Sequence, residues 1–250
     1  MKPRFLVLLA LSITVACRAT APTPSSPVTA GVPRAPSVEQ PFRASKAVRW
    51  VRESAEHRAL FLQVYRAATA RVERAAAGRT PGTWAVVLDA DETVIDNSLY
   101  QVEREERGLP FTPESWREWT ERREAVPLPG AREFLARVRA LGGRIAIVTN
   151  RREAECPDTE AVFGAHDLVY DVMLCRPGDG PSDKTSRFEA VARGTTPAGL
   201  PPLDVVAVLG DNIRDFTSLD QALRGQGDEA FNDFGVRFFV LPNPLYGSWE

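Results

Sequence analysis

The stretch WAVVLDADETVIDNS, residues 84–98, decides the fold. It begins with a continuous apolar run, 84–88, which stops abruptly at Asp89. A short apolar run without alternation is typical of a strand that is buried on both faces of a parallel sheet. Asp89 and Asp91 therefore follow a strand directly and are expected in one crevice. Two charged carboxylates there are costly unless a cation neutralises one and the other is protonated for part of a reaction cycle.

Four later apolar runs are the remaining candidate strands: 144–148, 168–174, 205–209 and 237–241, of which 168–174 is the weakest. Two of these runs end at polar residues, Thr149 in one case and Gly210 followed by Asp211 in the other. Helical stretches lie between the runs, for example over 131–140. Alternating strands and helices predict an α/β fold, a parallel sheet covered by helices on both faces. Ligands in such folds bind at the carboxyl ends of the strands, so these polar residues are expected in one crevice.

The folded region is expected to begin with a long helix. Apolar residues three and four positions apart predict one helix over 44–77, which ends at Gly78 and Pro81. His57 lies off the apolar stripe of this helix, so we expect it on the solvated surface.

Composition excludes several classes of protein. The 250 residues are 44% hydrophobic and 26% charged, which is average for soluble globular proteins and excludes a mainly disordered chain or a multi-pass membrane protein. The net charge of −2, without a long basic block, predicts no nucleic acid polymer as partner. The three cysteines are too few and too far apart for a disulfide framework or a zinc cluster. Whether Cys156 and Cys175 pair is left open by the sequence.

The N-terminus reads as a targeting segment. In residues 1–16, two basic residues precede a short apolar run, which predicts a secretory signal peptide rather than a membrane-spanning helix. The sequence ITVAC, which ends at Cys17, resembles a bacterial lipobox and predicts lipidation of that cysteine; the alternative is a signal peptide cut elsewhere. Residues 17–43 are rich in proline and predict an extended tether. The expected location is the bacterial cell envelope, lipid-anchored at the outer membrane or the periplasmic face.

Residues 89–98, DADETVIDNS, resemble the first motif of the bacterial class C acid phosphatases, a lipoprotein branch of the haloacid dehalogenase (HAD) superfamily. Three later stretches agree with the same family: VTNR at 148–151, GDNIRDF at 210–216 and LPNPLYGSWE at 241–250. The resemblance covers the chain from about Val48 to its end. Four motifs in order are far more specific than any one of them.

The resemblance implies both a fold and an activity. The fold would be a HAD-like Rossmannoid domain over 44–250, with a small, mostly helical cap inserted after the first motif strand at about 99–128. The activity would be that of a Mg²⁺-dependent acid phosphatase or 5′-nucleotidase. Its substrates would be small phosphate monoesters, nucleoside 5′-monophosphates in particular, hydrolysed through an aspartyl-phosphate intermediate.

The family's catalytic roles carry over to matching positions of this chain. Asp89 would be the nucleophile, and Asp91 would be the acid that protonates the leaving alcohol and then the base for the hydrolytic water. Thr149 and Asn150 would hold the phosphoryl oxygens. Lys184, in the run SDKTSRFE, would supply positive charge to the transferring phosphoryl group.

A magnesium site is implied at the same strand ends. Its ligands would be the side chain of Asp89, the main-chain carbonyl of Asp91 and the side chain of Asp211. Asp215 would orient Lys184 or a bound water from behind this site; the alternative is an acid that stabilises the start of a helix.

The cap is expected to set substrate specificity. In the class C pattern, an aromatic residue of the cap and one near the C-terminus hold the substrate between them. By position these are Trp116 and Tyr246, whose flat faces suit a nucleobase or a phenyl ring. The alternative for both is ordinary core packing, which we favour for Trp119.

Three other functions are alternatives to phosphate monoester hydrolysis. A nucleotide- or haem-binding surface lipoprotein with a vestigial phosphatase site is disfavoured because Asp89, Asp91, Lys184 and Asp211 are all present. Dehalogenation needs neither Asp91 nor Asp211. Transfer of the phosphoryl group to an alcohol stays open, as do the physiological substrate and a homodimer.

Overall fold

The structure is a computed structural model that describes residues 42–178 and 180–250. The expected signal peptide, Cys17 and almost all of the tether over 17–43 lie outside the described residues. Residues 42–250 form one compact unit. Within this described part, the helices lack the length and apolar character that crossing a membrane requires.

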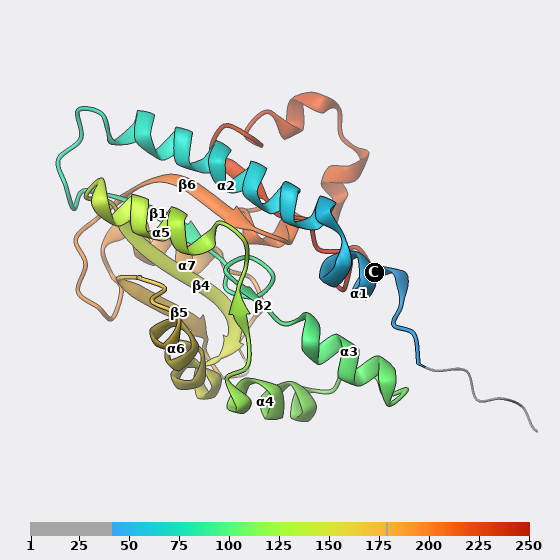
Figure 1. Ribbon diagram of the computed structural model, residues 1–250. Helices are drawn as coiled ribbons and strands as arrows, with labels where there is room; N and C mark the ends of the chain where they lie inside the picture. Colours follow the sequence, from blue (N-terminus) through green and yellow to red (C-terminus); the bar gives the residue numbers. More distant parts are fainter. Residues whose placement is uncertain (1–41, 179) are drawn as a thin grey trace, which may run out of the picture. The chain divides into compact units, whose positions relative to one another are not determined.

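Seven strands and seven α-helices make up this unit (Figure 1). The strands are β1 (Trp84–Leu88), β2 (Ile95–Asp96), β3 (Val126–Pro127), β4 (Arg144–Arg152), β5 (Val172–Arg176), β6 (Asp204–Gly210) and β7 (Phe238–Val240). The helices are α1 (Lys46–Glu53), α2 (Ala55–Ala76), α3 (Ser98–Glu106), α4 (Pro113–Arg122), α5 (Ala131–Ala140), α6 (Cys156–Ala165) and α7 (Thr185–Arg193). Short 3₁₀ turns connect several of them, including Ile213–Asp215 directly after β6.

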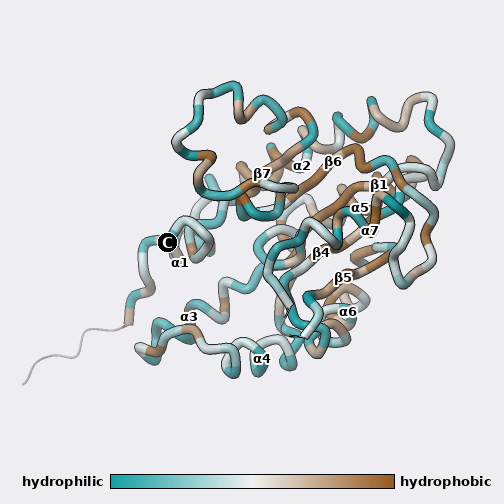
Figure 2. The backbone as a smooth tube through the Cα atoms, turned by 180° about the vertical axis from the view of Figure 1, so that it is seen from behind, coloured by the Kyte–Doolittle hydropathy of each residue, from teal (hydrophilic) through white to brown (hydrophobic). Residues whose placement is uncertain are grey.

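Five of the strands form one parallel sheet in the order β5-β4-β1-β6-β7. The central strand, β1, pairs with β4 on one side and with β6 on the other, so that Val87 lies opposite both Ala146 and Val208. Figure 2 shows these strands as the most hydrophobic part of the backbone. The α/β fold predicted from the sequence is confirmed, because parallel strands with buried runs occur where helices cover both faces.

Side chains of β1 alternate between two separate hydrophobic cores. Trp84, Val86 and Leu88 face the core formed with α2, α5 and α6, whereas Ala85 and Val87 face the core formed with α7. In Figure 1, α2 and α5 lie side by side over the first of these faces. Burial on both sides explains why β1 is apolar at every position.

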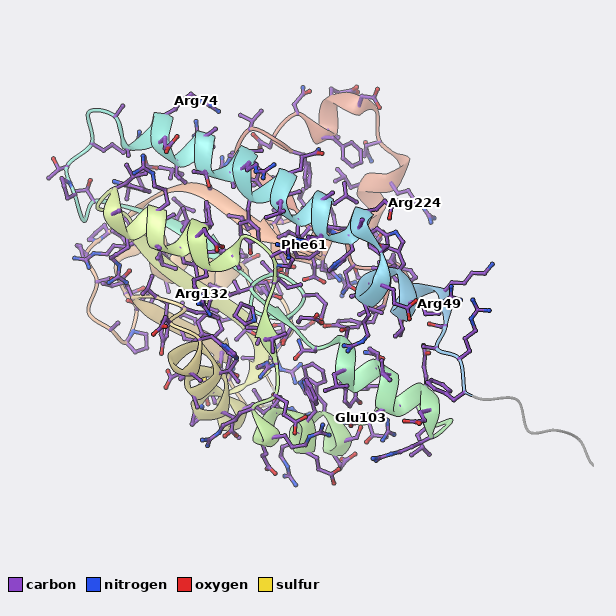
Figure 3. The ribbon with its side chains drawn as sticks, viewed as in Figure 1. Arg49, Phe61, Arg74, Glu103, Arg132 and Arg224 are labelled. Atoms are coloured by element: carbon purple, nitrogen blue, oxygen red, sulfur yellow. A yellow bond between two sulfur atoms is a disulfide. The ribbon has the colours of Figure 1, made fainter. Side chains whose placement is uncertain are left out.

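The first helical segment differs from the prediction. The single helix expected over 44–77 is broken at Ser54, whose backbone is extended and whose side chain caps α2 by accepting a hydrogen bond from the His57 amide. The break turns His57 inward, between Trp50 and Phe61, with only 6% of its surface exposed. The expectation of a solvated His57 was therefore wrong. Phe61, which is labelled on α2 in Figure 3, is buried in the core.

The insertion after β1 forms the expected, mostly helical cap. It consists of α3 and α4, and the short antiparallel pair β2–β3 joins its two ends. Arg122 on α4 binds Glu103 on α3, with Nη2 2.6 Å from Oε1 (Glu103 is labelled in Figure 3). The cap also contacts the first helix, because Arg52 Nη1 donates to Ser98 Oγ at 3.0 Å.

Candidate active site

Polar residues from the ends of three strands line one cleft of about 750 Å³. Asp89 follows β1, Asn150 lies near the carboxyl end of β4 and Asp211 follows β6. Their meeting follows from the parallel sheet, which brings the carboxyl ends of neighbouring strands to the same edge. Residues from the cap and from the C-terminal segment form the outer wall of the cleft.

Lys184 joins two carboxylates at the base of the cleft. Its Nζ lies 2.5 Å from Asp89 Oδ1 and 2.6 Å from Asp215 Oδ1, and all three side chains are buried. Lys184 immediately precedes α7, so the start of that helix delivers the ammonium group to the sheet edge. With 2% of its surface exposed, Lys184 is not a solvated surface lysine.

Burial and charge shift the protonation of these groups. Burial raises the pKa of Asp89 to about 7; Lys184 opposes this rise, and Asp215 and Asp91 add to it. Burial acts to lower the pKa of Lys184, but the carboxylates of Asp215 and Asp89 outweigh it and raise that pKa. Lys184 is therefore a fixed positive charge, whereas Asp89 changes its protonation state near neutral pH.

Arg151 and Asn97 hold the carboxylate of Asp91. Arg151 donates from Nη2 at 2.7 Å and from Nε at 3.0 Å, both to Oδ1, and Asn97 Nδ2 donates to the same oxygen at 2.9 Å. Arg151 is 2% exposed and also donates to Thr159 Oγ1 at 3.1 Å. These hydrogen bonds fix the orientation of the Asp91 side chain.

Carboxylate oxygens of Asp89, Asp211 and Asp215 lie within 4.8 Å of one another, which suits a small divalent cation. Both oxygens of Asp215 have protein partners, since Oδ1 binds Lys184 and Oδ2 accepts from the Asn212 amide at 2.9 Å. Asp211 also accepts on both oxygens, but only from the neutral donors Thr93 and Asn243, and Asp89 is bound only through Oδ1 among the described residues, so Asp89 and Asp211 are the better side-chain donors. The carboxylate of Asp91 is outside this group of side-chain oxygens.

Asp211 is also held in place from two directions. Asn243 Nδ2 donates to its Oδ2 at 2.8 Å, and Thr93 Oγ1 donates to its Oδ1 at 3.2 Å. Burial raises the pKa of Asp211 well above its usual value, with Asp215 and Asp89 adding to the rise. A carboxyl group with a raised pKa next to two others is the environment that a bound cation relieves.

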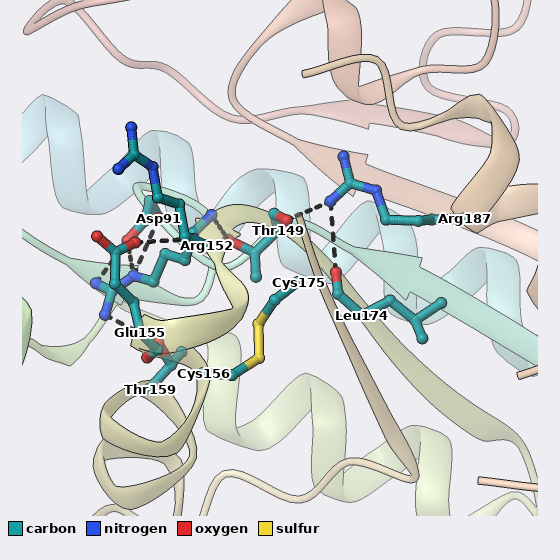
Figure 4. Close-up of a disulfide and its surroundings, with 10 residues drawn as sticks. Asp91, Thr149, Arg152, Glu155, Cys156, Thr159, Leu174, Cys175 and Arg187 are labelled. Carbon is teal, nitrogen blue, oxygen red and sulfur yellow. Dashed lines mark hydrogen bonds and ion pairs between the residues drawn. A yellow bond between two sulfur atoms is a disulfide. The ribbon is translucent and has the colours of Figure 1, made fainter. Parts of the chain in front are cut away.

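Arg187 anchors the two residues at the end of β4. Its Nη2 donates to Asn150 Oδ1 at 2.7 Å, and its Nη1 donates to the backbone carbonyl of Thr149 and, at 3.5 Å, to that of Leu174 (Figure 4). Because a guanidinium only donates, the contact assigns Oδ1 of Asn150 to Arg187 and leaves its amide hydrogens free. Thr149 is fully buried and Asn150 is exposed to the cleft.

Aromatic residues line the cleft from both sides. Trp116 and Phe111 come from the cap and Tyr246 from the C-terminal segment. Trp116 packs edge-on against Tyr100, with ring centroids 5.2 Å apart, whereas Phe111 is 61% exposed. The hydroxyl of Tyr246 donates to Glu92 Oε2. Trp119 is buried in the core, where its Nε1 donates to Asn97 Oδ1 at 2.8 Å.

A disulfide lies behind the end of β4. It joins Cys156, the first residue of α6, to Cys175 in β5, with the Cα atoms 6.2 Å apart (Figure 4). The sequence had left this pairing open.

Sequence reasoning missed three residues that shape the site: Arg151, Arg187 and Glu92. Arg151 stands inside the VTNR motif and Arg187 follows Lys184 by one helical turn, so their positions were a usable signal. Glu92 adopts a left-handed backbone with φ 49° and is buried, and no pattern in the neighbouring sequence predicts either feature.

Comparisons with known proteins agree with this arrangement. The family model described as HAD superfamily, subfamily IIIB (acid phosphatase), matches residues 29–249. The crystal structure of a class C acid phosphatase from Bacillus anthracis with tungstate bound is similar, with a TM-score of 0.72 and 29% identity. It covers 81% of this chain and 84% of its own. A second structure of the class C enzyme from Bacillus anthracis matches with a TM-score of 0.71, the same identity and the same coverage.

Proposed function

This chain belongs to the acid phosphatases of HAD subfamily IIIB, which are phosphoric monoester hydrolases, and we propose that it hydrolyses nucleoside 5′-monophosphates with Mg²⁺ through an aspartyl-phosphate on Asp89. The observation that carries this proposal is the pair of ion pairs that Lys184 forms with Asp89 and Asp215 at the base of the cleft, close to Asp211.

In the first step of the reaction, Asp89 attacks the phosphorus atom of the substrate. Lys184 binds its Oδ1, so Oδ2 is the oxygen for attack. As the new bond from Asp89 to phosphorus forms, the bond to the ester oxygen breaks. Lys184 and the amide hydrogens of Asn150 provide the positive charge and the hydrogen bonds that the phosphoryl oxygens need.

Asp91 takes part in two proton transfers. It protonates the leaving ester oxygen, and then accepts a proton from the water that attacks the phosphorus of the aspartyl-phosphate, which releases phosphate and restores Asp89. Both transfers need a carboxyl group that keeps its position between steps. Arg151 and Asn97 support this role because their hydrogen bonds to Oδ1 fix the Asp91 side chain.

Magnesium would be held by the side chains of Asp89 and Asp211 and by the main-chain carbonyl of Asp91. The oxygen-only donor set suits Mg²⁺, which binds a few carboxylates and keeps room for substrate phosphate and water. Bound there, the ion would offset the negative charge that the substrate's phosphate and Asp89 bring together. Thr93 and Asn243 hold Asp211 in the orientation that this task requires.

The preference for nucleotides is inferred from the aromatic walls. A nucleobase stacks on flat aromatic faces, and this cleft has such residues on its cap side and on its C-terminal side: Phe111, Trp116 and Tyr246. Its volume of about 750 Å³ is within the range of pockets that enclose small ligands. Trp116 is packed into the cap, so the exposed Phe111 is a second candidate for the cap-side face.

The test measures phosphate release from a panel of esters, with Mg²⁺ and with a chelator. We expect kcat/KM for 5′-AMP to exceed that for glycerol phosphate by about tenfold, and activity to disappear in EDTA and return with Mg²⁺. The near-isosteric variant Asp89→Asn should fold, with a cooperative melting transition, and be inactive. Equal rates for both esters would refute the nucleotide preference, and full activity in EDTA would refute the metal dependence.

The covalent intermediate has its own experiment. Asp91→Asn should slow release of the phosphoryl group from Asp89, so acid quenching after addition of phosphorus-32-labelled substrate should leave label on the protein. The matched control is Asp89→Asn in the same background, which should take up no label. Equal labelling of both proteins would refute Asp89 as the nucleophile.

We also propose that Cys17 carries a lipid that anchors the domain in the bacterial cell envelope. The short apolar run and the proline-rich segment after it support this assignment. The expected result is that Cys17→Ser moves the protein from the membrane fraction to the soluble fraction. A wild-type protein that is already in the soluble fraction would refute the anchor.

A further inference from the structure

Two arginines lie side by side at the rim of the cleft. Arg152 is the last residue of β4 and Arg176 the last of β5, and the two are paired across these neighbouring parallel strands. Neighbouring strands are about 4.8 Å apart, so their side chains leave the sheet close together. Both residues line the same cleft as Asp89 and Lys184.

No ion pair balances the charges of these two arginines within residues 42–178 and 180–250, although the buried carboxylate of Glu155, which accepts from the Arg152 amide at 2.8 Å, lines the same cleft. Among the described residues, which exclude Asp179, neither guanidinium has a carboxylate within 4.0 Å, whereas the third arginine at this edge, Arg151, is bound to Asp91. The Nε of Arg176 is buried and has no hydrogen-bond partner in that part of the chain. A buried donor without a partner is costly, and like charges on paired positions repel.

Arg176 lies near Arg187, the residue that holds Asn150. Burial is the main reason that the pKa of Arg187 is lowered, and Arg176 is the nearby cation that adds to it. Arg187 in turn holds Asn150 at the phosphate end of the cleft. The free positive charge is therefore next to the place where a substrate's phosphate is expected, not on a remote surface.

We propose that Arg152 and Arg176 form a second anion subsite, which binds an additional phosphate or carboxylate group on the phosphomonoester substrate. The inference rests on the proposed function, in that the ester phosphate occupies the site of Asp89. Two adjacent guanidinium groups offer several N–H donors in fixed planes, which match the oxygens of a phosphate or carboxylate. The favoured substrates are then phosphomonoesters with two anionic groups, such as nucleoside bisphosphates or phosphorylated carboxylic acids.

Two matched pairs of substrates test this inference with the full chain and Mg²⁺. One pair is 5′-AMP and adenosine 3′,5′-bisphosphate, and the other is glycerol 3-phosphate and 3-phosphoglycerate. We expect the member with two anionic groups to have the lower KM, by about tenfold, in at least one pair, as charged hydrogen bonds would give. A preference in only one pair identifies phosphate or carboxylate as the group that binds.

The variant Arg152→Gln/Arg176→Gln should abolish this preference and leave kcat/KM for the singly charged member within about twofold. The matched control is Arg214→Gln, because Arg214 also lines the cleft, but follows β6 on the other side of β1. It should keep the preference. Arg152 is exposed, so Arg152→Gln alone provides a variant that folds if the half-buried Arg176 does not tolerate change.

Three results would overturn the subsite: no preference in the wild type, a preference that survives in the double variant, or an equal loss in Arg214→Gln, which would indicate only a general positive field. Failure of the nucleotide proposal is distinguishable from these. If 5′-AMP is a poor substrate while the glycerol phosphate pair is hydrolysed, the pair of three-carbon esters still decides whether the subsite exists.

Discussion

Tyr246 donates its hydroxyl hydrogen bond to Glu92, and so joins the C-terminal segment to the loop that contains Asp89 and Asp91. Glu92 is buried and also accepts from the Asn97 amide at 2.8 Å. Burial raises its pKa well above the usual value, and Asp91 and Asp211 add to the rise. Tyr246 thus has two separable parts, a ring that lines the cleft and a hydroxyl that holds the catalytic loop.

Two substitutions separate the ring of Tyr246 from its hydroxyl. Tyr246→Phe should keep the ring and lower the free energy of unfolding by about 1 kcal/mol, because Glu92 loses one donor. Tyr246→Ala should in addition raise KM for 5′-AMP by about five- to a hundredfold, the worth of a lost stacking partner, and affect glycerol phosphate far less. Kinetics on both esters, with a melting curve for each variant, check this. An equal loss for both esters would assign Tyr246 a structural role alone.

Asp91 is the residue whose replacement should depend on the leaving group. Asp91→Asn should lower kcat/KM for 5′-AMP by about a hundredfold or more, because the ester oxygen leaves without its proton. The loss in kcat/KM should be much smaller for p-nitrophenyl phosphate, whose leaving group is stable without a proton. Values of kcat/KM for both substrates decide the matter, because they cover the steps up to the aspartyl-phosphate and not its hydrolysis, which both substrates share. Equal losses would contradict the role of Asp91 as an acid, and the melting curve of the variant controls for misfolding.

The five strands of the main sheet could be located from the sequence because their signal is local, although β4 continues to Arg152 beyond the predicted run 144–148 and β5 spans Val172–Arg176 rather than 168–174. The two-residue strands β2 and β3 were not predicted. The run 84–88 is apolar at every position, since both faces of β1 are covered, and the structure begins and ends β1 at the same residues. The break at Ser54 was missed, because a serine that caps one helix looks like any polar residue in a longer one. Lys184 could be assigned only through the family motif, since 95 residues separate it from Asp89 and no spacing rule connects them.

The surroundings of the motif residues could not be predicted in the same way. Whether Arg187 reaches Asn150 depends on how α7 packs against β4, and the two residues are 37 positions apart in sequence. The inward turn of Glu92 depends on a left-handed backbone that bulky residues seldom adopt, and that only the folded loop enforces. Family motifs identify the residues that react, whereas packing determines which residues hold them in place.

Arg187 should act through Asn150, and a double-mutant cycle tests this. Arg187→Met should lower kcat/KM for 5′-AMP by about tenfold, because the Asn150 amide is no longer held with its hydrogens toward the phosphate. In the Asn150→Ala background the same change should cost much less, since the residue that Arg187 positions is gone. Arg187→Lys keeps the charge but cannot replace the bonds to Asn150 and Thr149 together. Equal losses in both backgrounds would contradict positioning and indicate an independent effect.

The disulfide between Cys156 and Cys175 should contribute to stability. It closes a loop with a sequence separation of 19, which in the chain-entropy description corresponds to about 3 kcal/mol. Dithiothreitol should therefore lower the melting temperature of the wild type. The double variant Cys156→Ser/Cys175→Ser should melt at the lower temperature and be insensitive to the reductant. A wild type that melts at the same temperature with and without reductant, although its thiols become titratable, would refute the contribution.

Removal of magnesium should make stability depend on pH in a defined direction. In the metal-free protein the pKa of Asp89 is raised by burial to about 7, against about 3.9 in the unfolded chain, and that of Asp211 is raised as well. A raised carboxyl pKa means that stability is highest at a pH below the pKa of the unfolded chain and falls as the pH rises toward about 7.

Mg²⁺ binds only the charged carboxylates, so the gain in melting temperature on adding Mg²⁺ should grow between about pH 5 and pH 8. Melting curves at both pH values, with Mg²⁺ and with EDTA, measure this gain. Asp211→Asn should reduce it at pH 8, and a gain that is equal at both pH values would contradict competition between protons and magnesium at these carboxylates.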